Sequence, residues 1–300
     1  MFRQYSDIYA YSSIIKAFGR FSCRKKVTII INIYANVLDN CLSMNYDELE
    51  KWSYSVFCIR YIRRKERSTS MAKAERPFLI VNPKSYLYGQ KSLELALAAD
   101  KTAAETGLQI FFTCPYADIR LIRENTSHVV VCAQSLDPLT PGRGMGHVLP
   151  ESLKEAGADA VFLNHAENPK TVAELSACVK RAKELDMITV VCADSTMEAA
   201  AVACLDPDIV LAEPTDLIGT GKTADDSYVM ETVEALHKVN PNVLVMIASG
   251  VVTADDCYNV VRLGADGTGA TSGILNAPSP AVRVQEMAEA IVKAYKERTE

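Results

Sequence analysis

The chain has 300 residues, of which 49% are hydrophobic and 23% are charged, and its formal net charge is −5. This composition allows a large buried core and excludes a chain that is disordered throughout. The longest apolar run, residues 27–38, contains two asparagines and is shorter than a membrane-spanning helix, so we expect no membrane partner. The start of the chain lacks the pattern of a secretory signal.

Nine cysteines lie at wide and irregular spacings, and none forms a Cys-x-x-Cys pair. An odd number of scattered thiols is typical of reduced cysteines in a cytoplasmic protein. We therefore expect a cytoplasmic location, no disulfide framework and no metal site built on cysteine pairs.

The composition changes abruptly near residue 70. Residues 1–70 contain 12 basic and 6 acidic residues, whereas the remaining chain contains 20 basic and 31 acidic residues. Met71 opens the segment MAKAERPFLIVN, which resembles a translation start followed by a first strand. We therefore expect an N-terminal extension over residues 1–70 that has no part in the activity, from a vector or a mis-assigned start, and a domain over residues 71–300.

An alternative reading of the extension is a basic arm, because five basic residues lie between positions 60 and 67. Its aromatic residues match no recognisable nucleic-acid-binding module. We expect no nucleic-acid partner.

From residue 78 onward, short apolar runs alternate with longer segments of helical periodicity. The runs are Phe78–Asn82, Gln109–Thr113, His128–Gln134, Asp159–Asn164, Met187–Ala193, Asp208–Glu213, Asn242–Ala248 and Ala265–Ala270. The segments between and after them centre on residues 89–106, 116–125, 150–157, 169–185, 196–205, 226–239, 254–263 and 280–296. Continuously apolar runs predict parallel strands that are buried on both faces.

Eight such units in about 220 residues predict an α/β protein with a (β/α)8 barrel, called a TIM barrel. An open doubly wound sheet also alternates strands and helices, but it rarely reaches eight regular units of this length. In a barrel the chemistry lies on loops at the carboxyl ends of the strands. Lys84 and His165 follow the first and fourth runs and Glu213 ends the sixth, so we expect them to converge on one rim. A cation, an imidazole and a carboxylate suit removal of a proton beside a carbonyl group.

The order and spacing of three motifs resemble the triosephosphate isomerase family. These motifs are Asn-x-Lys at 82–84, NHAEN at 164–168 and EPTDLIGTG at 213–221. AQSLDP at 133–138 and GHVLPESLKEAGA at 146–158 are similar to the compact, archaeal-type branch of that family. The resemblance covers residues 78–296 and implies a triose-phosphate isomerase of glycolysis and gluconeogenesis, with a phosphorylated triose as substrate and no cofactor or metal. It also implies a homo-oligomer, either a dimer or a tetramer.

The resemblance assigns roles to individual residues. It implies that Glu213 is the catalytic base, that His165 is the electrophile, and that Lys84 and Asn82 bind the substrate. Glu167 is expected to pair with Lys84 behind the site. Pro214–Gly221 would be a lid, and the phosphate would be held by backbone N–H groups of Gly219, Ser249, Gly250, Ser272 and Gly273.

Three positions depart from the family pattern: Pro83, Ala166 and the segment Ala248-Ser249-Gly250. They leave two alternatives open, which are a different aldose–ketose isomerase of sugar phosphates and a non-catalytic sugar-phosphate-binding paralogue. A third alternative rests on Gly219-Thr220-Gly221-Lys222-Thr223, which resembles the end of a nucleotide-binding P-loop. That motif requires glycine at position 216, where this chain has Asp216.

Overall fold

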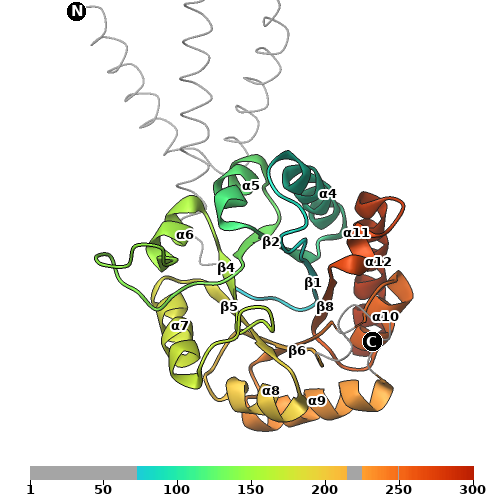
Figure 1. The fold of residues 1–300 in the computed structure, drawn as a ribbon. Helices are drawn as coiled ribbons and strands as arrows, with labels where there is room; N and C mark the ends of the chain where they lie inside the picture. Colours follow the sequence, from blue (N-terminus) through green and yellow to red (C-terminus); the bar gives the residue numbers. More distant parts are fainter. Residues whose placement is uncertain (1–72, 215–224, 249) are drawn as a thin grey trace, which may run out of the picture. The chain divides into compact units, whose positions relative to one another are not determined.

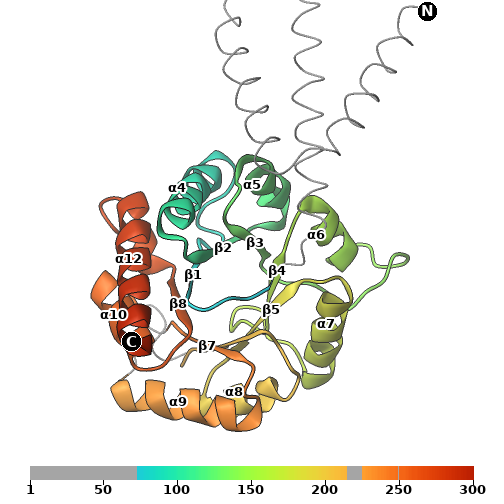
Figure 2. The same ribbon diagram turned by 180° about the vertical axis from the view of Figure 1, so that it is seen from behind.

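The computed structural model describes residues 73–214, 225–248 and 250–300. Eight parallel strands close into a barrel in sequence order, and helices surround it (Figure 1). The view from behind shows the same ring of helices around the strands (Figure 2). The prediction of a (β/α)8 barrel is confirmed. Within the described ranges, no helix has the length and hydrophobicity to span a membrane.

The observed strands lie within the predicted runs, apart from one residue at the end of β2, and the other seven are shorter than the runs by one or two residues at one or both ends. They are β1 (Phe78–Val81), β2 (Gln109–Cys114), β3 (Val130–Ala133), β4 (Ala160–Leu163), β5 (Ile188–Ala193), β6 (Ile209–Ala212), β7 (Leu244–Ile247) and β8 (Gly267–Ala270). Closure is made by β1 and β8, where Phe78 pairs with Gly267 and Ile80 with Gly269.

The helices also follow the predicted order. They are α4 (Gln90–Thr106), α5 (Ile119–Asn125), α6 (Pro150–Ala156), α7 (Val172–Glu184), α8 (Thr196–Ala203), α9 (Asp226–Val239), α10 (Ala254–Arg262), α11 (Ser272–Leu275) and α12 (Pro280–Thr299), with a 3-10 turn η1 (Tyr116–Asp118) before α5. Only α11 among them was not predicted. The predicted extension over residues 1–70 lies outside the described residues.

The core has two layers, because alternate strand residues face opposite sides of the barrel wall. Phe78, Ile80 and Phe111 belong to the inner layer, where the rings of Phe78 and Phe111 meet edge to face. Leu79 and Val81 point outward and belong to the layer between the strands and the helices. The packed interior therefore closes the barrel beneath its carboxyl rim.

Candidate active site

A pocket of about 640 Å³ lies where the strands end at the carboxyl rim of the barrel. Inner-layer side chains such as Ile80, Phe162 and Leu211 line its apolar part. Its polar lining comes from the segments that follow several different strands and includes Asn82, Lys84, Tyr86, His165, Glu213, Thr271, Ser272 and Asn276. This combination of an apolar wall with a few convergent polar groups is typical of a site for a small molecule.

Lys84 lies in this pocket with a backbone conformation that is uncommon for a residue with a side chain. Its φ is 48°, in the left-handed region. The N–H of Lys84 donates to Oδ1 of Asn82 at 2.9 Å, and Nε2 of Gln134 donates to the Lys84 carbonyl at 2.8 Å. The two side chains therefore hold the peptide groups on both sides of the strained residue.

The Lys84 ammonium is paired with the carboxylate of Glu167, with Nζ and Oε1 only 2.6 Å apart. The Lys84 side chain is 19% exposed, whereas that of Glu167 is 65% exposed. The hydrogen bond from Lys84 lowers the pKa of Glu167, and burial opposes this only in part. Glu167 is therefore ionised near neutral pH and fixes the cation at the pocket wall from the solvent side.

His165 follows β4, and its ring is oriented by the next turn of the chain. The backbone N–H of Glu167 donates to Nδ1 of His165 at 3.1 Å. A neutral ring that accepts at Nδ1 carries its proton on Nε2. Burial lowers the pKa of His165, and the charge of Lys84 lowers it further, while Glu167 and Asp194 act in the opposite direction. The imidazole is therefore neutral at neutral pH and has an N–H to donate.

Glu213 is the first residue after β6, and its backbone N–H donates to the Ala193 carbonyl at 2.9 Å. This bond continues the pairing of β5 with β6 by one residue and brings the side chain to the pocket. Burial raises the pKa of Glu213, the charge of Lys84 lowers it, and Asp194 and Glu167 raise it. A carboxylate whose pKa is raised is a better proton acceptor than an ordinary glutamate.

The opposite side of the pocket consists of the segments after β7 and β8. Gly250 has a φ of 69°, in a turn where the Val251 N–H donates to the Ala248 carbonyl. Ser272 opens α11, and the first N–H groups of a helix have no partner within the helix. Both Gly250 and Ser272 line the pocket.

Gly273 lies behind this wall. A Cβ atom at Gly273 would come within 2.6 Å of the Val252 Cα and 2.8 Å of the Val251 carbonyl oxygen. Gly273 therefore allows the segments after β7 and β8 to pack directly against each other. Gly273 is not among the residues that line the pocket.

The structure thus brings most of the expected residues to one place. Asn82, Lys84, His165, Glu213, Gly250 and Ser272 line the pocket, and Glu167 contacts Lys84 from outside it. Gly219, Ser249 and most of the expected lid Pro214–Gly221 lie outside the described residues. So does the P-loop-like segment 219–223.

Three contributing side chains received no role from the sequence. Gln134 holds the Lys84 carbonyl, Asn164 contacts three groups beside His165, and Asp194 affects the pKa values of both His165 and Glu213. Each of them follows an apolar run directly or ends it. Gln134 and Asn164 also lie in the family-like motifs AQSLDP and NHAEN, whereas position was the only signal for Asp194.

A cation, a neutral imidazole N–H and a carboxylate with a raised pKa therefore surround one small pocket. A carboxylate can take a proton from carbon, while the two donors stabilise negative charge on a neighbouring oxygen. In the described part of the chain, no three His, Cys, Asp or Glu side chains are grouped so that they could hold a metal ion.

Comparison with known proteins agrees with this geometry. The family profile described as triosephosphate isomerase matches residues 77–291. A triosephosphate isomerase from Methanobacterium bryantii is 38% identical over 211 residues, which are 69% of this chain and 93% of the relative. Relatives of the same name from Methanothermus fervidus and Caldivirga maquilingensis are each 36% identical, covering 71% and 72% of this chain and 98% of their own lengths.

The fold and pocket define the class of the protein, a (β/α)8 barrel with acid–base groups at its carboxyl rim. Within that class, the chain belongs to the triosephosphate isomerase family.

Proposed function

We propose that this chain interconverts glyceraldehyde 3-phosphate and dihydroxyacetone phosphate, as a triose-phosphate isomerase of glycolysis and gluconeogenesis. The observation that carries the proposal is the convergence of Lys84, His165 and Glu213 on one pocket. The archaeal relatives named triosephosphate isomerase support the choice of substrate.

Glu213 acts as the base in this proposal. Its carboxylate removes a proton from the carbon beside the substrate carbonyl, and the C–H electron pair moves to form an enediolate. The protonated Glu213 then returns the proton to the neighbouring carbon. The hydroxyl proton meanwhile moves from one substrate oxygen to the other through Nε2 of His165, so the aldehyde and ketone exchange places with no net change in atoms. Its raised pKa supports this role, because the base must hold the proton briefly between the two steps.

His165 and Lys84 stabilise the charge that forms on the substrate oxygens. The orientation of the His165 ring supports this role, because its Nδ1 accepts from the Glu167 backbone and Nε2–H remains as a donor. The Lys84 ammonium supplies positive charge in the same pocket. Asn82 holds the Lys84 backbone and orients the substrate beside it.

We further propose that backbone N–H groups of Gly219, Ser249, Gly250, Ser272 and Gly273 hold the phosphate group, with Pro214–Gly221 as the lid. Gly219, Ser249 and most of that lid lie outside the described residues. Support comes from Gly250, Ser272 and Gly273, which follow the last two strands, where barrels commonly bind phosphate. No cofactor is required, because the carbonyl group of the substrate accepts the electron pair.

We also infer a homo-oligomer, a dimer or a tetramer, in the cytoplasm. Membership of the triosephosphate isomerase family supports this inference, because the resemblance to that family implies a homo-oligomer.

The test is a coupled assay of the purified full chain with each triose phosphate in turn. Turnover in both directions, inhibited competitively by inorganic phosphate and unchanged by a chelator, is expected. Turnover of only a larger sugar phosphate would identify a different isomerase. Binding of triose phosphate without turnover would identify a non-catalytic sugar-phosphate-binding protein, and either result would refute the proposal.

A further inference from the structure

The segment 164–170 connects β4 to α7 and carries His165. It begins at Asn164, which has a φ of 59° in the left-handed region. Inside the segment, the N–H of Asn168 donates to the His165 carbonyl at 2.7 Å. The His165 ring can point in a fixed direction only if this short segment is itself held in place.

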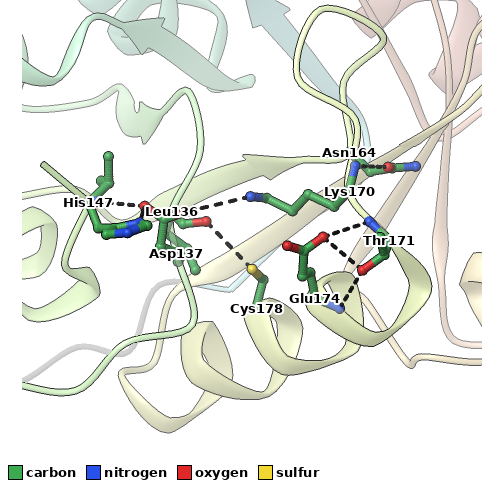
Figure 3. A network of polar contacts seen from close by, with 9 residues as sticks. Leu136, Asp137, His147, Asn164, Lys170, Thr171, Glu174 and Cys178 are labelled. Carbon is green, nitrogen blue, oxygen red and sulfur yellow. Dashed lines mark hydrogen bonds and ion pairs between the residues drawn. The ribbon is translucent and has the colours of Figure 1, made fainter. Parts of the chain in front are cut away.

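The side chain of Asn164 holds the segment at three points. Its Oδ1 accepts the backbone N–H of Lys170 at 2.9 Å, which joins the first residue of the segment to the last (Figure 3). Its Nδ2 donates to the Cys192 carbonyl at 3.0 Å and to Oε1 of Glu198 at 3.3 Å. One amide therefore closes the segment and fastens it to the end of β5 and the start of α8.

The far end of the segment is anchored independently. The Lys170 side chain is only 9% exposed, and it extends toward Asp137, with Nζ and Oδ1 3.9 Å apart (Figure 3). Asp137 also accepts the backbone N–H of Val148 at 2.7 Å. Directly after Lys170, Thr171 caps α7. Because Lys170 is held in place, its backbone hydrogen bond to Oδ1 of Asn164 also restrains Asn164 and the neighbouring His165.

Glu198 in turn fixes the orientation of the Asn164 amide. Its other carboxylate oxygen accepts the backbone N–H of Asp194 at 2.8 Å, so Oε1 remains directed at Nδ2 of Asn164. An amide that donates to two acceptors and accepts one N–H has a single orientation that satisfies all three bonds.

We propose that Asn164 is a positioning residue for His165, and that Glu198 assists it by fixing the Asn164 amide. Asn164 does not line the pocket, so it acts through the ring of its neighbour and not on the substrate. The proposal rests on the proposed isomerase function. A displacement of about 1 Å at a catalytic group can reduce the rate by about 100-fold.

The first test replaces Asn164 with glycine. Glycine adopts a φ of 59° without strain, so Asn164→Gly removes the amide and leaves the backbone conformation accessible. We expect kcat to fall by about tenfold or more. The inhibition constant of inorganic phosphate should change less than about twofold, because Asn164 follows β4 and none of the residues of the proposed phosphate cradle does.

The matched control is Asn240→Gly. Asn240 also donates through its side-chain amide, to Asp206 at 3.2 Å, but it lies at the end of α9 and does not line the pocket. Its kcat should equal that of the unaltered chain. An Asn164→Gly variant with unaltered kcat would overturn the proposal.

A second pair of variants tests the role of Glu198 and covers the case in which Asn164→Gly does not fold. Asn164→Asp keeps the acceptor for the Lys170 N–H but turns an oxygen toward the Cys192 carbonyl and the Glu198 carboxylate. Adding Glu198→Gln supplies a donor to that oxygen. We expect the single variant to lose kcat by about tenfold and the double variant to recover about threefold or more. If the loss of kcat in the double variant equals the product of the losses in Asn164→Asp and Glu198→Gln, the proposed assistance from Glu198 is overturned.

A spectroscopic measurement distinguishes this proposal from the isomerase function itself. The ¹⁵N chemical shifts of His165 in the ligand-free chain report which ring nitrogen carries the proton, with no turnover required. We expect an Nε2–H ring in the unaltered chain and a mixture of tautomers in Asn164→Gly. If the unaltered chain does not turn over triose phosphate, the function is refuted. If the His165 shifts are the same in both proteins, the positioning role is refuted.

Discussion

Substitution of Gly269 tests how tightly the barrel interior is packed beneath the pocket. It lies in β8, pairs with Ile80 of β1, and lines the bottom of the pocket. An added Cβ atom would lie 2.6 Å from the Ile80 carbonyl oxygen, 2.7 Å from Cε of Met246 and 3.0 Å from the Ile80 Cβ. Gly269→Ala therefore adds one methyl group where the chain has no room for it.

The expected loss of stability in Gly269→Ala depends on which of the neighbouring atoms can move. The methyl group of Met246 can rotate away, but the Ile80 carbonyl belongs to the backbone of a closed barrel. The contact must lengthen from 2.6 Å to at least 3.0 Å, so β1 and β8 must separate. Overpacking of a core costs about 1–3 kcal/mol, and we expect the upper end of that range because the obstacle is backbone.

The assay is denaturant unfolding of both proteins at one protein concentration. The control is Gly107→Ala, at a glycine with a φ of 71° and no atom within 4 Å of the added Cβ. This control carries conformational strain of about 1–2 kcal/mol without overpacking. A Gly269→Ala variant as stable as Gly107→Ala would refute the reasoning.

Three further predictions concern titration, stability and the extension. In a ¹³C and ¹⁵N titration of the ligand-free chain, the pKa of Glu213 should lie above the usual 4.5 and that of His165 below the usual 6.5. A shift of either pKa in the opposite direction would contradict the account of the site. Asp100→Ala should cost about 1–3 kcal/mol, because Oδ1 of Asp100 accepts three backbone N–H groups, including that of buried Val129. Burial raises the pKa of Asp100, but these hydrogen bonds outweigh it and the net shift is downward. The contribution of Asp100 to the free energy of unfolding should therefore be present above pH 3.8 and be lost as the pH falls through the lower folded pKa. A stability difference between the unaltered chain and Asp100→Ala that does not change with pH would contradict this. A chain that begins at Met71 should fold and retain full turnover, and loss of soluble active protein would show that the extension is needed.

The fold could be predicted because burial on both faces leaves continuous apolar runs in the sequence. The runs overestimate the strands at their ends, where Asn82, Asn164 and Glu213 come directly after the last residue of a strand and lie at the rim. Helix α11 could not be predicted, since four residues are too few to show helical periodicity.

The apolar runs also allowed part of the pocket to be predicted. Lys84, His165 and Glu213 are polar residues that closely follow apolar runs, so a barrel places them on one rim. The supporting contacts could not be predicted, because they join segments that are distant in sequence. Gln134 contacts a carbonyl 50 residues away, and Asn164 contacts one 28 residues away. Such contacts depend on how neighbouring loops meet after the barrel has closed.

The central claim is that Glu213 moves a proton between two carbons of a triose phosphate. Exchange of substrate hydrogen in deuterated water measures that step directly, and Glu213→Gln keeps the size of the side chain while removing the base. General-base catalysis contributes about 10²–10⁴-fold, so deuterium incorporation and kcat should both fall by about 10³-fold or more, with little change in phosphate affinity. Near-normal exchange and turnover in Glu213→Gln would contradict the account.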